Sequence, residues 1–308
     1  MPSKVLVTGA SGFVGAALIP RLTRDGHDVR AFGRAAGRVR AHVPVVEGDA
    51  VTGAGLDAAL EGVECAYFLI HSMETAGTAN GGDFAERDRR AARAFADAAR
   101  VAAVRRVVYL GGLVPADASP SPHLASRLEV ERILLDAAPE GVAFRASIVI
   151  AAASRSFRFL VHLVERLPVL ALPDWREHRT QPIDGRDVIE FLARAATAPG
   201  LAGRSLDIAG PDVVSYADMI ERIREAMVVG RPALHLRLEA TPVASRVAAV
   251  IAGEDHALIG PLMQGLSHDL LPRDSAAAEL LGVRLHSFDA AVERALRDWE
   301  AAEPLAAR

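Results

Sequence analysis

Residues 4–15 read KVLVTGASGFVG, an apolar run followed by glycines at positions 9, 12 and 15, and residues 16–22 after them have a helical composition. This order predicts a strand, a tight turn and a helix. In such a turn the first glycine permits the bend, the second lets backbone amides approach a pyrophosphate, and the third lets helix and strand pack closely. The unpaired N–H groups at the start of the helix then face the dianionic group. The segment therefore predicts a dinucleotide site with the contact residues Gly9, Ser11, Gly12, Phe13, Val14 and Gly15.

Outward from this loop, short β-branched runs alternate with alanine-rich segments, the pattern of βαβ units and a parallel sheet. We expect an α/β fold, a doubly wound parallel Rossmann sheet over residues 1–152, to which segments around 176–210 return. A smaller, irregular, proline-rich part over 153–308 is expected to bind substrate, and residues 231–287 receive no role. The predicted strands are 4–8, 28–32, 43–47, 66–71, 107–110, 143–149 and 203–209, and the clearest helices are 83–101, 215–227 and 288–300.

Composition excludes several classes of protein. A formal net charge of −4 over 308 residues gives no electrostatic reason to expect a nucleic-acid partner. The longest run without Asp, Glu, Lys or Arg, residues 5–20, is shorter than the ~20 residues of a membrane-spanning helix and contains all three loop glycines. With Cys65 as its single cysteine the chain can form no internal disulfide, so we expect a cytoplasmic protein. No metal-binding spacing occurs in the sequence, so we expect no metal. The expected assembly is a monomer or a homodimer.

The residues after the second, third and fourth strands indicate which nucleotide binds. NAD sites place an acidic residue near the end of the second strand, but residues 29–34 contain none and end in Arg34, which suits the 2′-phosphate of NADP. A solvated surface charge is the alternative interpretation of Arg34. Asp49 and Ala50 follow the third strand, near the expected adenine, and Ile70 and His71 follow the fourth, near the expected nicotinamide. Ser72 is placed similarly. We therefore expect NADPH as the cofactor.

Six motifs stand along the chain: TGASGFVG (8–15), EGDA (47–50), YFLIHSM (67–73), VVYLGG (107–112), TQPIDGRDV (180–188) and IAGPDVVSY (208–216). In these motifs the chain resembles an atypical member of the extended short-chain dehydrogenase/reductase superfamily, of the NmrA-like or NAD(P)H-binding kind. The resemblance covers most of residues 1–230, and its cofactor motif is more specific than its substrate motifs.

The chain departs from the residues on which the chemistry of this superfamily rests. Gly111 and Gly112 stand in the region of the usual serine, and HLASR (123–127) stands where the family has Tyr-x-x-x-Lys. The resemblance thus implies His123 as the proton donor and Arg127 as the ribose anchor, with Glu131 on the same helix face. Arg127 would also lower the pKa of His123, because it opposes the charged imidazolium. The alternative is a histidine at a helix start followed by an Arg127–Glu131 ion pair.

Three functions compete on this evidence. The leading hypothesis is an NADPH-dependent oxidoreductase that reduces a small, rather apolar carbonyl compound or activated alkene. The alternative is a non-catalytic NAD(P)H-sensing or assembly protein, like NmrA-like regulators or the accessory Rossmann subunit of complex I, which keep the glycine loop and lack the tyrosine and lysine. A sugar-nucleotide epimerase is disfavoured, because that chemistry normally needs the tyrosine. The substrate itself is left open.

Overall fold

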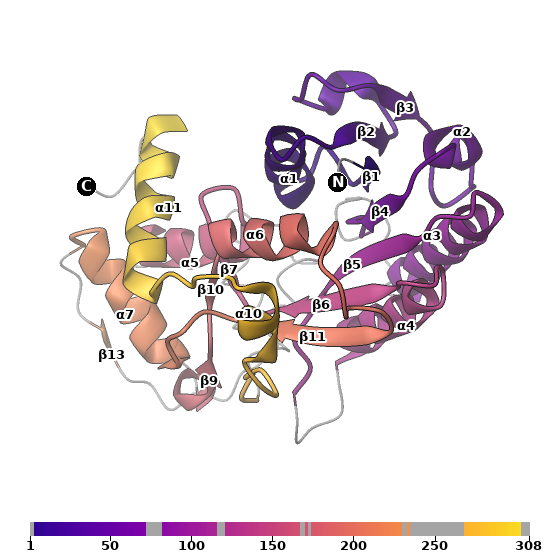
Figure 1. Ribbon diagram of the computed structural model, residues 1–308. Coiled ribbons are helices and arrows are strands. Elements are labelled where there is room, and N and C mark those ends of the chain that lie inside the picture. The colour runs from indigo at the N-terminus through magenta and orange to yellow at the C-terminus, as the bar shows by residue number, and fades with distance from the viewer. Residues whose placement is uncertain are drawn as a thin grey trace.

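The computed structural model describes residues 3–71, 82–115, 121–166, 170–171, 174–229, 233–234 and 268–302. Its centre is a seven-stranded parallel sheet with the strand order β11-β6-β5-β4-β1-β2-β3 (Figure 1). The order reverses between β1 and β4, which is where doubly wound sheets bind ligands. The strands are β1 (Lys4–Thr8), β2 (Asp28–Gly33), β3 (Val45–Glu47), β4 (Cys65–Phe68), β5 (Arg106–Gly112), β6 (Val142–Ala146) and β11 (Arg204–Ile208).

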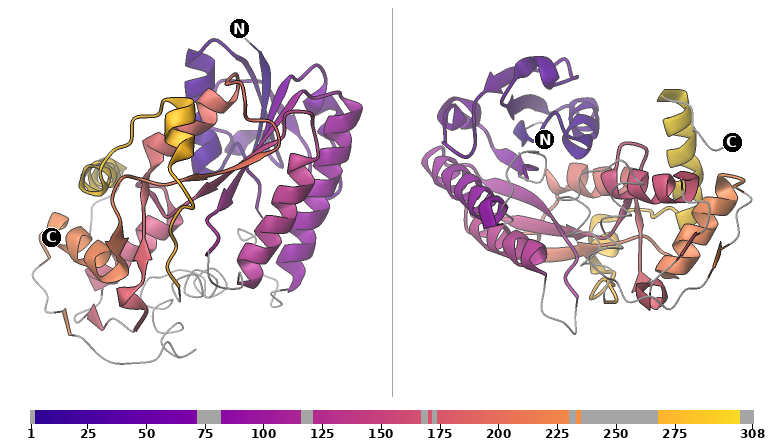
Figure 2. Two further views of the ribbon diagram at one scale, coloured as in Figure 1. Left: turned by 60° about the horizontal axis from the view of Figure 1, so that its bottom comes forward. Right: turned by 180° about the vertical axis from the view of Figure 1, so that it is seen from behind.

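Helices cover both faces of the sheet, because its strands are apolar on both sides. On one face lie α1 (Phe13–Arg24) and α6 (Gly185–Ala195). On the other lie α2 (Leu56–Leu60), α3 (Gly82–Val101) and α4 (Pro122–Leu135), and Figure 2 shows α3 and α4 side by side there. The predicted Rossmann fold is therefore confirmed.

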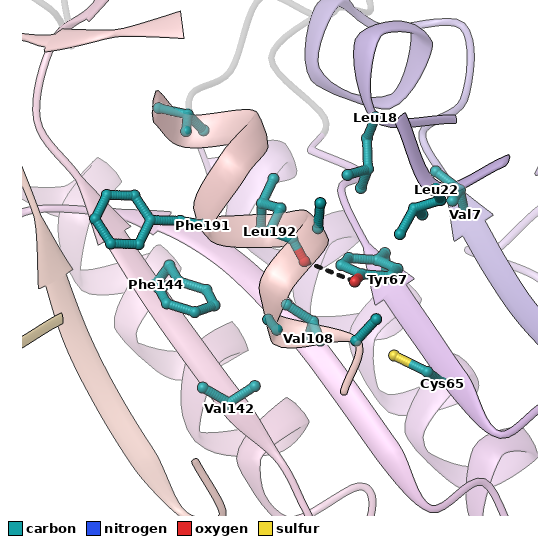
Figure 3. Packing of buried hydrophobic residues seen from close by; sticks show 14 of the residues in the cluster. Val7, Leu18, Leu22, Cys65, Tyr67, Val108, Val142, Phe144, Phe191 and Leu192 are labelled. Carbon is teal, nitrogen blue, oxygen red and sulfur yellow. Dashed lines mark hydrogen bonds between the residues drawn. The ribbon is translucent and has the colours of Figure 1, made fainter. Parts of the chain in front are cut away.

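The core under α1 and α6 contains one polar group that is fully paired. Tyr67 on β4 lies among apolar side chains, and its hydroxyl donates a hydrogen bond of 2.7 Å to the carbonyl oxygen of Leu192 (Figure 3). Cys65 is buried in the same cluster, as expected for a free cysteine, and burial raises its thiol pKa to about 12. Neither side chain is available for chemistry.

A second core belongs to the C-terminal part of the chain. It forms between α5 (Arg155–Arg166), α7 (Tyr216–Ala226) and α11 (Phe288–Ala302), where Phe157 packs edge to face on Trp299. Ser215 caps α7 in a capping box with Asp218, as the sequence predicts for Ser215. The remaining elements are short: η1 (Ala36–Arg38), β7 (Val149–Ile150), β8 (Leu170–Ala171), η3 (Asp174–Glu177), β9 (Arg179–Thr180), β10 (Ile183–Asp184), β12 (Val214–Ser215), β13 (Ala233–Leu234) and α10 (Ala276–Leu281).

The structure corrects two of the predicted strands. The strand expected over 143–149 is two strands, because the chain leaves the main sheet after Ala146 and β7 pairs with β10 instead. The strand expected over 66–71 ends at Phe68, so residues 69–71 form a loop beside the first glycine. Among the helices of the described ranges, none combines the length and the apolar character needed to cross a bilayer.

Candidate functional site

A cavity of about 1110 Å³ runs along the carboxyl ends of the parallel strands. Residues that directly follow β1, β2, β3, β4 and β6 line it, together with the end of β5 and the first turns of α4 and α5. The residues predicted for cofactor binding and catalysis all lie on its wall: Gly9, Ser11, Gly12, Phe13, Val14, Gly15, Arg34, Asp49, Ala50, Ile70, His71, His123 and Arg127.

The backbone of the glycine loop is held tightly at two of its three glycines. Gly9 has a φ of +65°, and a Cβ there would collide with the carbonyl of Leu69. A Cβ on Gly15 would collide with the carbonyl oxygen of Gly9, so α1 can start this close to the loop only with glycine at 15. The Thr8 hydroxyl donates to the Tyr67 carbonyl at 2.9 Å and accepts from the Leu69 N–H at 3.2 Å, which joins the loop to β4.

Gly12 differs from the other two glycines, because its missing side chain leaves space. A Cβ there would contact one atom within 4 Å, the Gly9 carbonyl oxygen at 3.2 Å. Gly12 is the N-cap of α1, and no side chain caps this helix, so the first N–H groups face the cavity without a side-chain partner. This open, uncapped helix start fits the pyrophosphate of a dinucleotide.

Three arginines gather at the end of the cavity beside β2 and β3. Arg34, Arg38 and Arg40 line it and are exposed, and no hydrogen bond or ion pair engages their guanidinium groups within the described ranges. Asp49 also lines this end, but its carboxylate already accepts the Val51 N–H at 2.8 Å and so forms a turn. The cavity is therefore cationic where the adenosine half of a dinucleotide would lie.

On α4, His123 and Arg127 face the cavity, whereas Glu131 does not. Glu131 is buried and accepts bidentate hydrogen bonds from Arg145 of β6, at 2.7 and 2.9 Å, and a third from Ser205 of β11 at 2.6 Å. The alternative Arg127–Glu131 ion pair does not form, because Arg145 takes both carboxylate oxygens. Glu131 thus follows His123 and Arg127 at four-residue intervals along α4, as expected, but it does not line the cavity.

Burial and the charge of Arg127 keep both histidines of the site neutral at pH 7. Burial, followed by Arg127, lowers the pKa of His123 to about 4. Burial also lowers the pKa of His71 to about 3, and the positive charges of Arg127 and Arg155 add to this effect. The Nδ1 atom of His71 is buried, and no atom of the described residues forms a hydrogen bond with it. Such an atom is a candidate for contact with a ligand.

The absence of a serine at position 111 has a steric reason. A Cβ on Gly111 would lie 3.0 Å from the ring of Tyr109 and 3.6 Å from its hydroxyl oxygen. Burial raises the pKa of Tyr109, and its interaction with Arg127 opposes that rise. The Tyr109 ring therefore occupies the space into which a side chain at position 111 would extend.

The far wall of the cavity could not be predicted from the sequence. This wall consists of residues from α5, α7 and the loop after β6, among them Arg155, Phe159, Leu160, Leu163 and Met219. Tyr216 also lines the cavity, and burial raises its pKa to about 12. The apolar face of α5 could have indicated core packing but not this cavity, because the docking of α5 on the sheet is tertiary.

Other polar residues that could have served the site are paired within the fold. Arg145 is held by Glu131, Arg179 is paired with Asp269, and Gln181 donates to the Gly210 carbonyl. Ser147 lines the cavity and lies 3.3 Å from the Thr180 hydroxyl, and Ser72 lies outside the described residues. In the described part of the chain, no group of three or more His, Cys, Asp or Glu side chains has metal-binding geometry.

Comparisons with known proteins identify the N-terminal part of the chain as similar to NAD(P)H-binding domains. Residues 9–144 match the NAD(P)H-binding family model. A 3-beta-hydroxysteroid dehydrogenase of Mycolicibacterium neoaurum is 37% identical over 78 residues, which is 25% of this chain and 21% of that relative. The chain thus matches about a fifth of the length of this curated relative.

Solved structures with a similar fold cover nearly the whole chain. An epimerase from Methanothermobacter thermautotrophicus has a TM-score of 0.75 at 16% identity and covers 98% of this chain and 93% of its own. A short-chain dehydrogenase/reductase superfamily protein from Agrobacterium tumefaciens, solved with bound NAD, has a TM-score of 0.71 at 20% identity, covering 97% and 96%. At these identities the likeness establishes the fold.

Proposed function

Because the chain has an NAD(P)H-binding domain in residues 9–144 and the fold of the extended short-chain dehydrogenases/reductases, we propose that it is an NADPH-dependent oxidoreductase. Its substrate is a small, rather apolar carbonyl compound or activated alkene. The observation that carries this proposal is that one cavity joins the uncapped start of α1 to His123, Arg127 and an apolar wall.

Arginine at the end of β2 supports NADPH over NADH. Arg34 takes the 2′-phosphate in paired charge-assisted hydrogen bonds, and the absence of an acidic side chain in residues 29–34 removes the group that would repel it. The N–H groups at the start of α1 hold the pyrophosphate. Arg127 holds the ribose hydroxyls on the nicotinamide side. It replaces the lysine of the family in this role.

The bound cofactor supplies a hydride, and the protein places the substrate's oxygen or conjugated carbonyl beside a hydrogen-bond donor. We assign this donor to His123, whose imidazole is neutral at pH 7 because burial and Arg127 lower its pKa to about 4. A neutral imidazole can polarise a carbonyl through its N–H, without becoming imidazolium first. His123 therefore donates a hydrogen bond to the oxygen on which negative charge develops and passes its N–H proton to it, and a proton from solvent restores the neutral imidazole.

The test compares His123→Phe with Arg127→Met in NADPH oxidation, with a panel of apolar aldehydes, ketones and enones that includes a 3-oxosteroid. We expect His123→Phe to lower turnover by ~10²–10⁴ with little change in NADPH affinity, because a positioned donor contributes that much. Arg127→Met should instead weaken NADPH binding. In the parent protein the turnover should not titrate with a histidine pKa between pH 6 and 8. Unchanged turnover in His123→Phe would exclude this residue and point to His71.

One observation favours a second function, a non-catalytic NAD(P)H sensor. The chain lacks the family's serine, tyrosine and lysine, and the Tyr109 ring fills the space beside Gly111. A sensor would bind NADPH through the same loop but would not oxidise it in the presence of any compound of the panel. NADPH binding without any oxidation would therefore favour the sensor over the reductase.

A further inference from the structure

Helix α5 lines one wall of the cavity with side chains of different chemical character. Arg155, Phe159 and Leu163 follow one another at intervals of four residues, so they lie on the same side of the helix, and all three line the cavity. The eight helical steps from residue 155 to residue 163 span about 12 Å. Within that length the wall changes from a guanidinium to an aromatic ring and then to an aliphatic side chain.

We propose that this strip selects the substrate of the oxidoreductase, and that the substrate is an amphipathic carboxylate. Its carboxylate lies against Arg155, and its apolar body lies against Phe159, Leu160 and Leu163. This inference rests on the function proposed above and makes it more specific, because it adds an anionic group to the apolar carbonyl compound or alkene.

The charges around Arg155 favour an anion at this place. The positive charges of Arg155 and Arg127 both help to lower the pKa of His71. All three residues line the cavity, so two guanidinium groups lie near the same end of it. Among the described residues that line the cavity, Asp49 is the one carboxylate, and it lies after β3, at the other end of the sheet.

A buried polar atom at this end also points to a ligand. Within the part of the chain that the structure describes, the Nδ1 atom of His71 has no hydrogen-bond partner, although the ring is neutral and can donate or accept one hydrogen bond there. A buried polar atom without a partner costs free energy that a bound polar group can recover. The carboxylate or the reacting carbonyl of the substrate provides such a group.

The apolar part of the strip argues against a nucleotide sugar as the occupant. Sugar hydroxyls need hydrogen-bond partners when they leave water, and Phe159, Leu160, Leu163 and Met219 offer none. An alkyl or aryl group instead gains from burial at this wall. A guanidinium also matches the two oxygens of a carboxylate in a fork geometry.

The experiment titrates the NADPH-saturated protein with 4-phenylbutyrate and with 4-phenylbutyramide, its uncharged match, by calorimetry. We expect the carboxylate to bind about tenfold more tightly or better, and Arg155→Met to abolish this preference while it leaves the amide unaffected. Arg297→Met, an exposed arginine on α11, is the matched control and should change neither affinity.

Three outcomes would overturn the inference: no preference for the carboxylate, a preference that survives Arg155→Met, or tight binding of UDP-glucose in place of 4-phenylbutyrate. NADPH affinity is measured in each variant, so a failure of cofactor binding is seen separately. Normal NADPH binding without a carboxylate preference rejects this inference and leaves the proposed reductase standing. If the parent protein does not bind NADPH, the proposed function itself is rejected.

Discussion

Arg127 and Glu131 stand one helical turn apart on α4, yet their side chains serve different parts of the molecule. Glu131 is buried and joins α4 to β6 and β11 through Arg145 and Ser205. A buried carboxylate needs such partners, because the cost of leaving it unpaired is several kcal/mol, about 3–5 in measured cases. Arg145 and Ser205 are these partners, so Glu131 does not pair with Arg127, and Arg127 faces the cavity.

Arg34 permits a test of cofactor preference at the scale of one side chain. Arg34→Ala should weaken NADPH binding about tenfold or more and leave NADH binding nearly unchanged, because one charge-assisted contact to the 2′-phosphate contributes about 1.5–3 kcal/mol. Calorimetry at fixed salt with both nucleotides gives the two dissociation constants. Arg297→Ala, an exposed arginine away from the cavity, is the control. Equal affinities of the parent protein for NADPH and NADH would contradict the expected preference.

At the scale of elements, the loop between β1 and α1 contains one glycine that is needed for nucleotide binding and another that is needed for folding. Gly12→Val should abolish nucleotide binding and leave the fold largely intact, because a side chain at 12 enters open cavity with an ordinary φ of −78°. Gly15→Val should instead destabilise the protein, since its Cβ would collide with the Gly9 carbonyl oxygen. Circular dichroism and nucleotide titration of the two variants distinguish these effects. Normal nucleotide binding by a folded Gly12→Val variant would show that the loop is structural.

At the scale of the whole molecule, the two neutral histidines make stability depend on pH. Their folded pKa values, about 3 for His71 and about 4 for His123, lie below the unfolded value of 6.5. Between pH 4 and 6.5 the unfolded chain therefore binds more protons, and the free energy of unfolding falls as the pH is lowered through this range.

Urea unfolding at several pH values between 6.5 and 5 tests this expectation. That window lies above the range in which the carboxylates Glu140, Glu190 and Asp269, with lowered pKa values, lose their stabilising charge. Replacing both histidines by glutamine should flatten the dependence there, and the exposed His42 replaced in the same way is the control. A slope that survives the double substitution would assign the effect to other groups.

Features that are encoded by residues close together in the chain could be predicted from the sequence. The strand, turn and helix of residues 4–24 are encoded by neighbouring residues, and so are the main strands and the Ser215 cap. The residues expected at the strand ends come together in one cavity, because parallel strands bring their carboxyl ends to one edge.

The rest depended on contacts between distant segments. The Rossmann sheet and its glycine loop follow from the amino-acid sequence alone, since spacing and apolar period act within a few residues. Tertiary packing was needed to establish that Glu131 meets Arg145, that the Tyr109 ring fills the space beside Gly111, and that α5 and Tyr216 close the cavity. Each of these depends on the packing of one element against another, and no local pattern in the chain specifies which side chains then meet.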